Sequence, residues 1–229
     1  MISILSALQN TLGEFIDLGG PVVMLLIAMS VLAVAMILMK LWQFWRAGVG
    51  RHERILAALH ANDHGDHEGA MKLASSSKSH LGELTVVALC VGPHYDHDAL
   101  RARLTGMAEL NMSRLQSGFR LLDSIAQIAP LLGLFGTVLG MIGAFQALQE
   151  AGANVDPSAL AGGIWVALLT TAMGLGVAMP AALVLTWFES KVAAEGRLAM
   201  TVVDSTLCVG LPSAPDHAVM SEARAAANV

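Results

Sequence analysis

The chain has 229 residues, of which 55% are hydrophobic and 14% are charged, and its mean hydropathy is +0.62. This composition excludes an ordinary soluble domain and is typical of one membrane bundle with soluble extensions. The modest net charge of −5 argues against nucleic-acid binding, and the widely separated Cys90 and Cys208 are interpreted as free thiols.

Residues 1–19 are predicted to form an amphipathic helix that lies along the periplasmic membrane interface. Glu14 and Asp17 precede the long apolar run and no basic residue does, so the segment does not have the pattern of a signal peptide. The apolar residues that recur at helical spacing are Ile2, Leu5, Leu8, Leu12, Phe15 and Ile16.

The first transmembrane helix is predicted over residues 20–45. Asp17 and Lys40 bracket an uncharged stretch that is long enough to cross the hydrocarbon core as a helix. Trp42 and Trp45 follow as aromatic residues of the kind that anchor a span at the membrane surface.

Residues 46–124 are predicted to form a cytoplasmic region of helices. Short helices are expected around Ile55 and Ala70 and from Leu81 to Cys90, before a break at Gly92-Pro93. A further helical stripe then runs towards the second span as one long helix, which we expect to be interrupted or kinked at Pro130.

Histidines cluster in the connector HANDHGDHEG. His60, His64 and His67 are spaced so that two imidazoles could share a zinc ion, and they could also sense pH. The alternative is a solvated linker, which is favoured because Gly65 interrupts the cluster and no cysteine lies near it. The nearby Arg46, Arg51 and Arg54 are interpreted mainly as topology signals; binding of anionic headgroups is the alternative.

The second transmembrane helix is predicted over residues 125–148, which contain no charged residue. Gly133, Thr137, Gly140 and Ala144 recur every three or four positions and form a stripe of small residues. Burial of large apolar side chains does not drive helix association in lipid. Such a stripe therefore usually means that another helix backbone approaches closely.

A periplasmic loop, residues 149–159, is predicted to lead into the third transmembrane helix, residues 160–188. Pro180 is expected to bend this helix. Residues 189–229 are predicted to continue as a cytoplasmic helix to about Leu207, with a disordered tail from Pro212. The small stripe of the third span consists of Gly163, Ala167, Thr171, Gly174, Ala178 and Ala182.

The expected fold is therefore an all-α membrane protein with three transmembrane helices and long cytoplasmic helical extensions of spans two and three. Of the 13 Lys and Arg residues, ten lie between the first and second spans or at the end of the first, and three follow the third span. The positive-inside rule then predicts that the N-terminus is outside and the C-terminus is cytoplasmic.

No Asp, Glu, Lys, Arg or His lies in the apolar interior of the three spans. The chain alone therefore has no titratable group that could relay a proton there. The remaining polar groups are hydroxyls, for which the simplest role is a bond to the carbonyl of the preceding turn. The alternative is that several copies surround a partner helix whose carboxylate supplies the missing group. The hydroxyls in question belong to Thr137, Thr170, Thr171 and Thr186.

Two stretches resemble the signature spans of the MotA/TolQ/ExbB proton-channel family, namely GLFGTVLGMIGAF at Gly133 to Phe145 and ALLTTAMGLGVAMPA at Ala167 to Ala181. The resemblance also covers the approach RLQSGFRLLDSIAQIAP and the whole third span. Three spans with an external N-terminus resemble ExbB or TolQ, because the flagellar stator members have four. Within this pair the chain is more similar to ExbB-type proteins.

The resemblance implies a proton-channel or motor subunit of the inner membrane. It implies a homopentamer around two helices of an ExbD- or TolR-like partner, whose intramembrane Asp carries protons. Proton flow would energise a TonB-like periplasm-spanning protein for outer-membrane transport. Thr137 and Thr171 match the threonines that face the pore in the family, and the positions expected to pack against the partner helix are Gly133, Gly140, Ala144, Gly163, Ala167, Gly174 and Ala178.

One position departs from the family pattern. Many ExbB-like chains carry a Glu five positions before the second Thr, where this chain has Val166. If that Glu serves proton conduction in the family, this member either uses another route or has a specialised role.

Two alternatives to an ExbB role remain: a TolQ-like subunit of an envelope-integrity motor, and an oligomeric membrane scaffold that does not conduct. The sequence contains no nucleophile motif, phosphate loop or metal cluster of convincing spacing. We therefore expect neither an enzyme nor a bound cofactor or metal.

Overall fold

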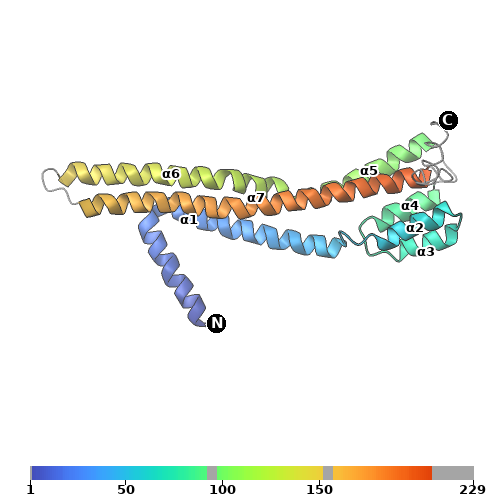
Figure 1. The fold of residues 1–229 in the computed structure, drawn as a ribbon, viewed down its shortest axis with the longest axis horizontal. Helices are drawn as coiled ribbons and strands as arrows, with labels where there is room; N and C mark the ends of the chain where they lie inside the picture. The colour runs from blue at the N-terminus through green and yellow to red at the C-terminus, as the bar shows by residue number, and fades with distance from the viewer. Residues whose placement is uncertain (1, 92–96, 152–156, 208–229) are drawn as a thin grey trace, which may run out of the picture. The chain divides into compact units, whose positions relative to one another are not determined.

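The computed structural model describes residues 2–91, 97–151 and 157–207, and all regular secondary structure in these ranges is α-helical (Figure 1). The predicted break at Gly92-Pro93, residues 152–156 of the predicted loop 149–159 and the predicted disordered tail lie outside the described residues. The other residues of that loop, 149–151 and 157–159, are helical, so any loop is shorter than predicted. The helices are α1 (Ile2–Ala47), α2 (Glu53–Asp63), α3 (His67–Ser75), α4 (Gly82–Val91), α5 (His97–Gln116), α6 (Phe119–Ala151) and α7 (Pro157–Leu207).

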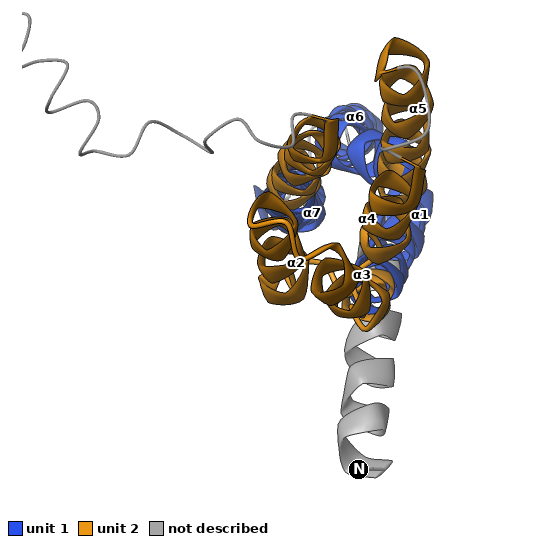
Figure 2. Ribbon diagram, turned by 90° about the vertical axis from the view of Figure 1, so that its right-hand side faces the viewer, with its two compact units in different colours: residues 1–42, 117–189 blue, residues 43–116, 190–229 orange. Residues whose placement is uncertain are grey.

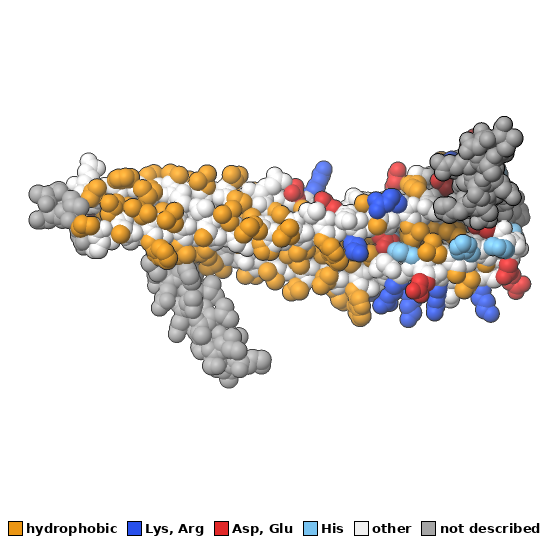
Figure 3. Space-filling model, in the orientation of Figure 1, with side chains coloured by type: hydrophobic (Ala, Val, Ile, Leu, Met, Phe, Trp, Pro, Cys, Tyr) orange, Lys and Arg blue, Asp and Glu red, His pale blue; other side chains and the backbone are white. Residues whose placement is uncertain are grey.

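Three helical segments of the described chain are long and apolar enough to cross a membrane, which confirms the predicted number of spans. They lie within Gly20–Ala47, His97–Glu150 and Leu160–Leu207. On the face seen in Figure 3, hydrophobic side chains are spread along the apolar parts of these segments, and many large ones are exposed, as expected for surfaces that meet lipid or other helices.

Helix α1 is broken at Gly20, which has φ of 61° and ψ of −158°. Positive φ is readily adopted only by glycine, and Pro21 fits the start of the helix that follows because a first helical turn does not need its N–H. The chain before Gly20 is helical, as predicted. Its location at the membrane interface stays a prediction.

The helix leading into the second span is interrupted at Ser117 and Gly118, where Gly118 has φ of +83°. Helix α6 continues through Pro130, so the expected interruption there was wrong, and a kink at that residue stays a prediction. A Cβ at Gly118 would lie 3.0 Å from Cε of Met36 and 3.5 Å from Cε of Lys40, which are the ends of flexible side chains, so it is the positive φ of this turn that requires glycine.

The chain forms two compact units (Figure 2). Unit 1 comprises residues 1–42 and 117–189, and unit 2 comprises residues 43–116 and 190–229. Helix α7 runs unbroken from the third span into unit 2, so the predicted helical continuation is present.

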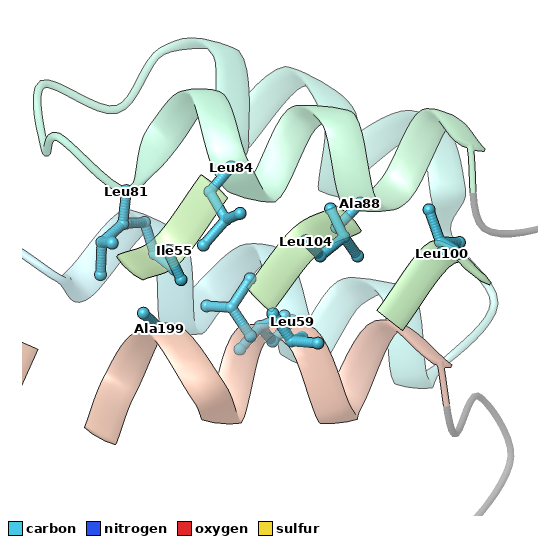
Figure 4. Packing of buried hydrophobic residues seen from close by; sticks show 11 residues of the cluster. Ile55, Leu59, Leu81, Leu84, Ala88, Leu100, Leu104 and Ala199 are labelled. Atoms are coloured by element: carbon cyan, nitrogen blue, oxygen red, sulfur yellow. The ribbon is translucent and has the colours of Figure 1, made fainter. Parts of the chain in front are cut away.

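The core of unit 2 is built by α2, α4, α5 and the last turns of α7 (Figure 4). Aliphatic side chains at helical spacing meet in one cluster because each amphipathic helix can bury its apolar stripe only against the others. The cluster contains Ile55, Leu59, Leu81, Leu84, Ala88, Leu100, Leu104, Ala108, Ala199, Val202 and Val203.

Unit 2 also buries a carboxylate. Glu195 of α7 is 2% exposed, and its Oε1 accepts a hydrogen bond from the Gly50 backbone N–H at 2.9 Å and lies 2.9 Å from Nε2 of His52. Nε2 of His80 lies 3.6 Å from Oε2 of Glu195, which is close enough for charge attraction but too long for a good hydrogen bond. The cluster ties two connecting segments to α7.

Burial lowers the pKa of His80 below its ordinary value of 6.5, although the Glu195 carboxylate acts in the opposite direction. The folded unit therefore favours neutral His80. As pH falls through 6.5 towards the lowered pKa, the unfolded chain takes up a proton that the folded unit resists. The free energy of unfolding of unit 2 must decrease over that interval.

We expect hydrogen exchange in α2 of the full chain to accelerate as pH falls below 6.5, after correction for the intrinsic pH dependence of exchange. His80→Gln removes the titrating group and should flatten this dependence. His60→Gln, which changes an exposed histidine of the same helix region, should leave it unchanged. Equal pH dependence in wild type and His80→Gln would contradict the assignment.

Candidate functional site

Helices α6 and α7 approach each other at glycines. A Cβ added at Gly174 would lie 2.5 Å from the carbonyl oxygen of Ala129, and one added at Gly133 would lie 2.9 Å from the carbonyl oxygen of Thr170. These separations are too short for a real Cβ, so the two backbones can meet only because both residues lack a side chain. Such close contact is how helices gain packing energy in lipid.

The contact continues along both helices in antiparallel register. A Cβ at Gly140 would lie 3.0 Å from Cβ of Ala167, and one at Gly163 would lie 2.6 Å from Cβ of Ala144. Figure 1 shows α6 and α7 running side by side over this stretch. The predicted small residues therefore bring two helices of one chain together, and their contact with a partner helix stays a prediction.

Helix α1 joins this pair within unit 1. Val22 and Leu26 of α1 form a buried cluster with Ala129 of α6 and Ala178 of α7. The predicted packing position Ala178 is thus covered by residues of the same chain, and three helices share one small core.

Two threonine hydroxyls lie at the crossing. Oγ1 of Thr170 and Oγ1 of Thr171 each lie 3.2 Å from the carbonyl oxygen of Gly133 and donate a hydrogen bond to it. Thr170 is buried and also donates to the Ala167 carbonyl of its own helix at 2.7 Å. The hydroxyls of α7 therefore bond across to α6 as well as along their own helix.

Thr137 behaves differently. Its hydroxyl donates to the Leu134 carbonyl of the preceding turn at 2.6 Å, which is the local role considered for any intramembrane threonine. The structure records no hydrogen bond between Thr137 and Thr171, although both lie on facing helices. Thr186 bonds locally in the same way, to the Ala182 carbonyl at 2.9 Å.

A lysine is buried at the end of the first span. Lys40 is 2% exposed, its Nζ donates to Oγ of Ser117 at 3.3 Å, and it lies 5.3 Å from the ring centroid of Phe119. Phe119 in turn stacks on Phe188 with 5.9 Å between ring centroids. The aromatic face and the hydroxyl stabilise a cation that would otherwise be costly to bury.

Sequence reasoning missed the cross-helix bond of Thr170 and the burial of Lys40. Thr170 lies beside the small stripe rather than on it, and Lys40 has the spacing of an ordinary flanking charge. Among the described residues, no group of three His, Cys, Asp or Glu side chains is arranged to hold a metal ion. The histidines of the predicted metal or pH site, His60, His64 and His67, are all exposed.

Gly174→Ala should destabilise the α6–α7 pair by about 1–3 kcal/mol, because the added methyl meets a backbone carbonyl that cannot easily move. Gly176→Ala is the matched control, since nothing lies within 4 Å of its added Cβ and alanine favours the helix. Thermal unfolding of both variants in detergent tests this. Equal melting temperatures would contradict the crossing.

Comparison with known proteins places the chain in a family. Residues 76–199 match the MotA/TolQ/ExbB proton channel family, and this segment is more than half of the chain. It includes α6 and the part of α7 that carries the glycine crossing.

The chain is also similar to individual proteins over part of its length. The chain is 41% identical over 96 residues to the biopolymer transport protein exbB1 of Vibrio cholerae, covering 42% of each chain. It is 49% identical over 70 residues to a putative ExbB homologue of Methanothermobacter thermautotrophicus, spanning 31% of this chain and 24% of that protein. It is 30% identical over 186 residues to a putative ExbB-like protein of Synechocystis, spanning 79% of this chain and 71% of the relative.

The chain thus spans less than half of the first two of these relatives and more than two thirds of the third. Three apolar helices, a glycine crossing with threonine hydroxyls and a family match over that same crossing lead to one conclusion. The chain belongs to the MotA/TolQ/ExbB proton channel family.

Proposed function

We propose that this chain is the channel subunit of an ExbB-ExbD-type motor, which uses the proton gradient to energise a TonB-like protein for outer-membrane transport. One observation carries the proposal. The hydroxyls of Thr170 and Thr171 lie at a tightly packed crossing of two apolar helices whose membrane interior contains no acid or base. Hydroxyls can hand on or solvate a proton, but they cannot hold one at neutral pH.

The missing proton carrier must then come from another chain. We assign it to an ExbD- or TolR-like single-span partner with an intramembrane Asp, surrounded by a homo-oligomer of this chain, a pentamer as in the family. Large apolar side chains such as Leu131, Phe135 and Leu168 are exposed on α6 and α7, which supports further helix or lipid contacts there.

Within that assembly, Thr137 and Thr171 would line the proton path. Thr171 is partly exposed while its hydroxyl donates to the Gly133 carbonyl, so part of this residue remains accessible to a further partner. The membrane potential can supply the energy for this work. One charge that crosses about 100 mV releases about 2.3 kcal/mol, and the energies of several protons add up.

The charge distribution supports a location in the inner membrane with the N-terminus outside. The Lys and Arg residues gather in the segment between the first two spans and after the third, and the loop after the second span has none. The helical extensions of spans two and three would then be cytoplasmic.

A non-conducting scaffold is the second candidate, and a specific observation favours it. The small residues of both stripes pack within one chain, and Thr137 bonds to its own helix. These residues could therefore serve assembly alone. The same arrangement fits a TolQ-like subunit. An ExbB-like and a TolQ-like subunit would differ in the protein that they energise.

Thr171→Val tests conduction, because it removes the hydroxyl and keeps the shape. We expect proton flux into liposomes that contain this chain and its ExbD-type partner to fall by about ten-fold or more, while the partner still co-purifies. Thr186→Val is the control and should conduct normally, since its hydroxyl bonds only to the Ala182 carbonyl. Unchanged flux in Thr171→Val, with an intact complex, would favour the scaffold.

A further inference from the structure

We propose that unit 2 carries a binding pocket for the phosphate headgroup of an anionic phospholipid, close to the end of α1. The pocket has a volume of about 400 Å³ and is lined by Gly50, Arg51, Glu53, Arg54, Ser77 and Lys78. Three of these side chains are cationic and one is anionic, so the lining carries a net positive charge. On the face seen in Figure 3, Lys and Arg side chains lie around α2–α4 together with Asp, Glu and His side chains.

The walls of the pocket are two segments held firmly together. One wall is the turn after α1 with the first residues of α2, and the other is the connector between α3 and α4. The His80 N–H donates to the Ala47 carbonyl at 3.0 Å, which links the two segments. A Cβ at Gly48 would lie 2.5 Å from the carbonyl oxygen of Lys78, and Gly48 has φ of +65°, so the segments touch where only glycine fits.

The first wall is also fixed from behind. Gly50, with φ of +85°, donates its N–H to the buried Glu195 carboxylate at 2.9 Å. That carboxylate lies 2.9 Å from Nε2 of His52, so its charge is directed to the interior partners rather than to the pocket. The backbone of the pocket is therefore formed before any ligand arrives, which reduces the entropy cost of binding.

The cationic side chains are available. No ion pair in the part of the chain that the structure describes involves Arg51 or Lys78, and both are exposed. Nη1 of Arg54 donates to the Ser76 carbonyl at 2.6 Å, which orients the guanidinium and leaves its other N–H groups for an anion. Arginine and lysine in a preformed concave site suit the oxygens of a phosphate group.

The position along the chain indicates a lipid rather than a soluble phosphate. Trp45, in the last turn of α1, is 72% exposed, as expected for an indole at the membrane surface. Arg51 N–H donates to the Gly48 carbonyl and Gly48 N–H to the Trp45 carbonyl, so the chain turns back instead of extending away. Even fully extended, Trp45 and Gly50 could be only about 18 Å apart, which keeps the pocket near headgroups.

The test uses the purified full chain in an uncharged detergent and native mass spectrometry. The probes are dioctanoyl phosphatidylglycerol, dioctanoyl phosphatidylcholine and inorganic phosphate. We expect phosphatidylglycerol to bind at least about ten-fold more tightly than either of the others. No preference for phosphatidylglycerol over phosphatidylcholine would overturn the proposal. Binding of inorganic phosphate as tight as that of the lipid would also overturn it, since the site would then serve a soluble anion.

The double variant Arg51→Gln, Lys78→Gln should bind phosphatidylglycerol about thirty-fold more weakly, because it lacks two protein cations that would contact the headgroup phosphate. The matched control is Lys72→Gln with Arg103→Gln, which removes the same charge from exposed positions outside the pocket. It should leave affinity unchanged within about two-fold. If the control lost the same affinity for phosphatidylglycerol, the overall charge of the protein would explain the effect, and the proposed site would be overturned.

Glu53→Gln is expected to increase affinity, a result that misfolding of the variant would not produce. Loss of this carboxylate from the lining should strengthen phosphatidylglycerol binding about five-fold. Unchanged or weaker binding in Glu53→Gln would contradict a phosphate in this pocket. These measurements do not involve proton flux, so their failure and the failure of the proposed channel function are independent.

Discussion

Backbone contact between α6 and α7 is the constraint on which unit 1 depends. In a bilayer the hydrophobic effect does not hold helices together, so packing and hydrogen bonds must do so. Gly133 and Gly174 allow the two backbones to meet, and the hydroxyls of Thr170 and Thr171 donate to the Gly133 carbonyl. Any larger residue at the two glycines would separate the helices and break these bonds together.

The close packing of α6 and α7 also limits what unit 1 can do chemically. The small residues and the Thr170 hydroxyl are used inside the chain, and the membrane interior of the spans contains no titratable group. A rigid helix pair of this kind can present a hydroxyl-bearing surface to a proton carrier but cannot be the carrier. This fits membership of the MotA/TolQ/ExbB proton channel family, and it is the reason why we propose that a separate partner chain supplies the acidic group.

The sequence predicted those features of the fold that depend on residues close together along the chain. Unbroken apolar runs predicted three spans, and the spacing of Gly133, Gly140, Gly163 and Gly174 predicted close helix contact. Features that depend on distant residues were missed. The helix breaks at Gly118 and not at Pro130, because a glycine turn is fitted there against Met36 and Lys40, whereas a proline inside a membrane helix is tolerated. The pairing of Glu195 with His52 and His80 likewise joins segments that no sequence spacing connects.

The carbonyl 13C chemical shift of Gly133, recorded by solid-state NMR on the full chain in lipid bilayers, tests the central claim most directly. A carbonyl that accepts threonine hydroxyls has a 13C resonance displaced downfield. Replacement of both Thr170 and Thr171 by valine should therefore move the Gly133 signal upfield while the other α6 carbonyl signals stay in place. A Gly133 shift that is the same with and without the two hydroxyls would contradict the account.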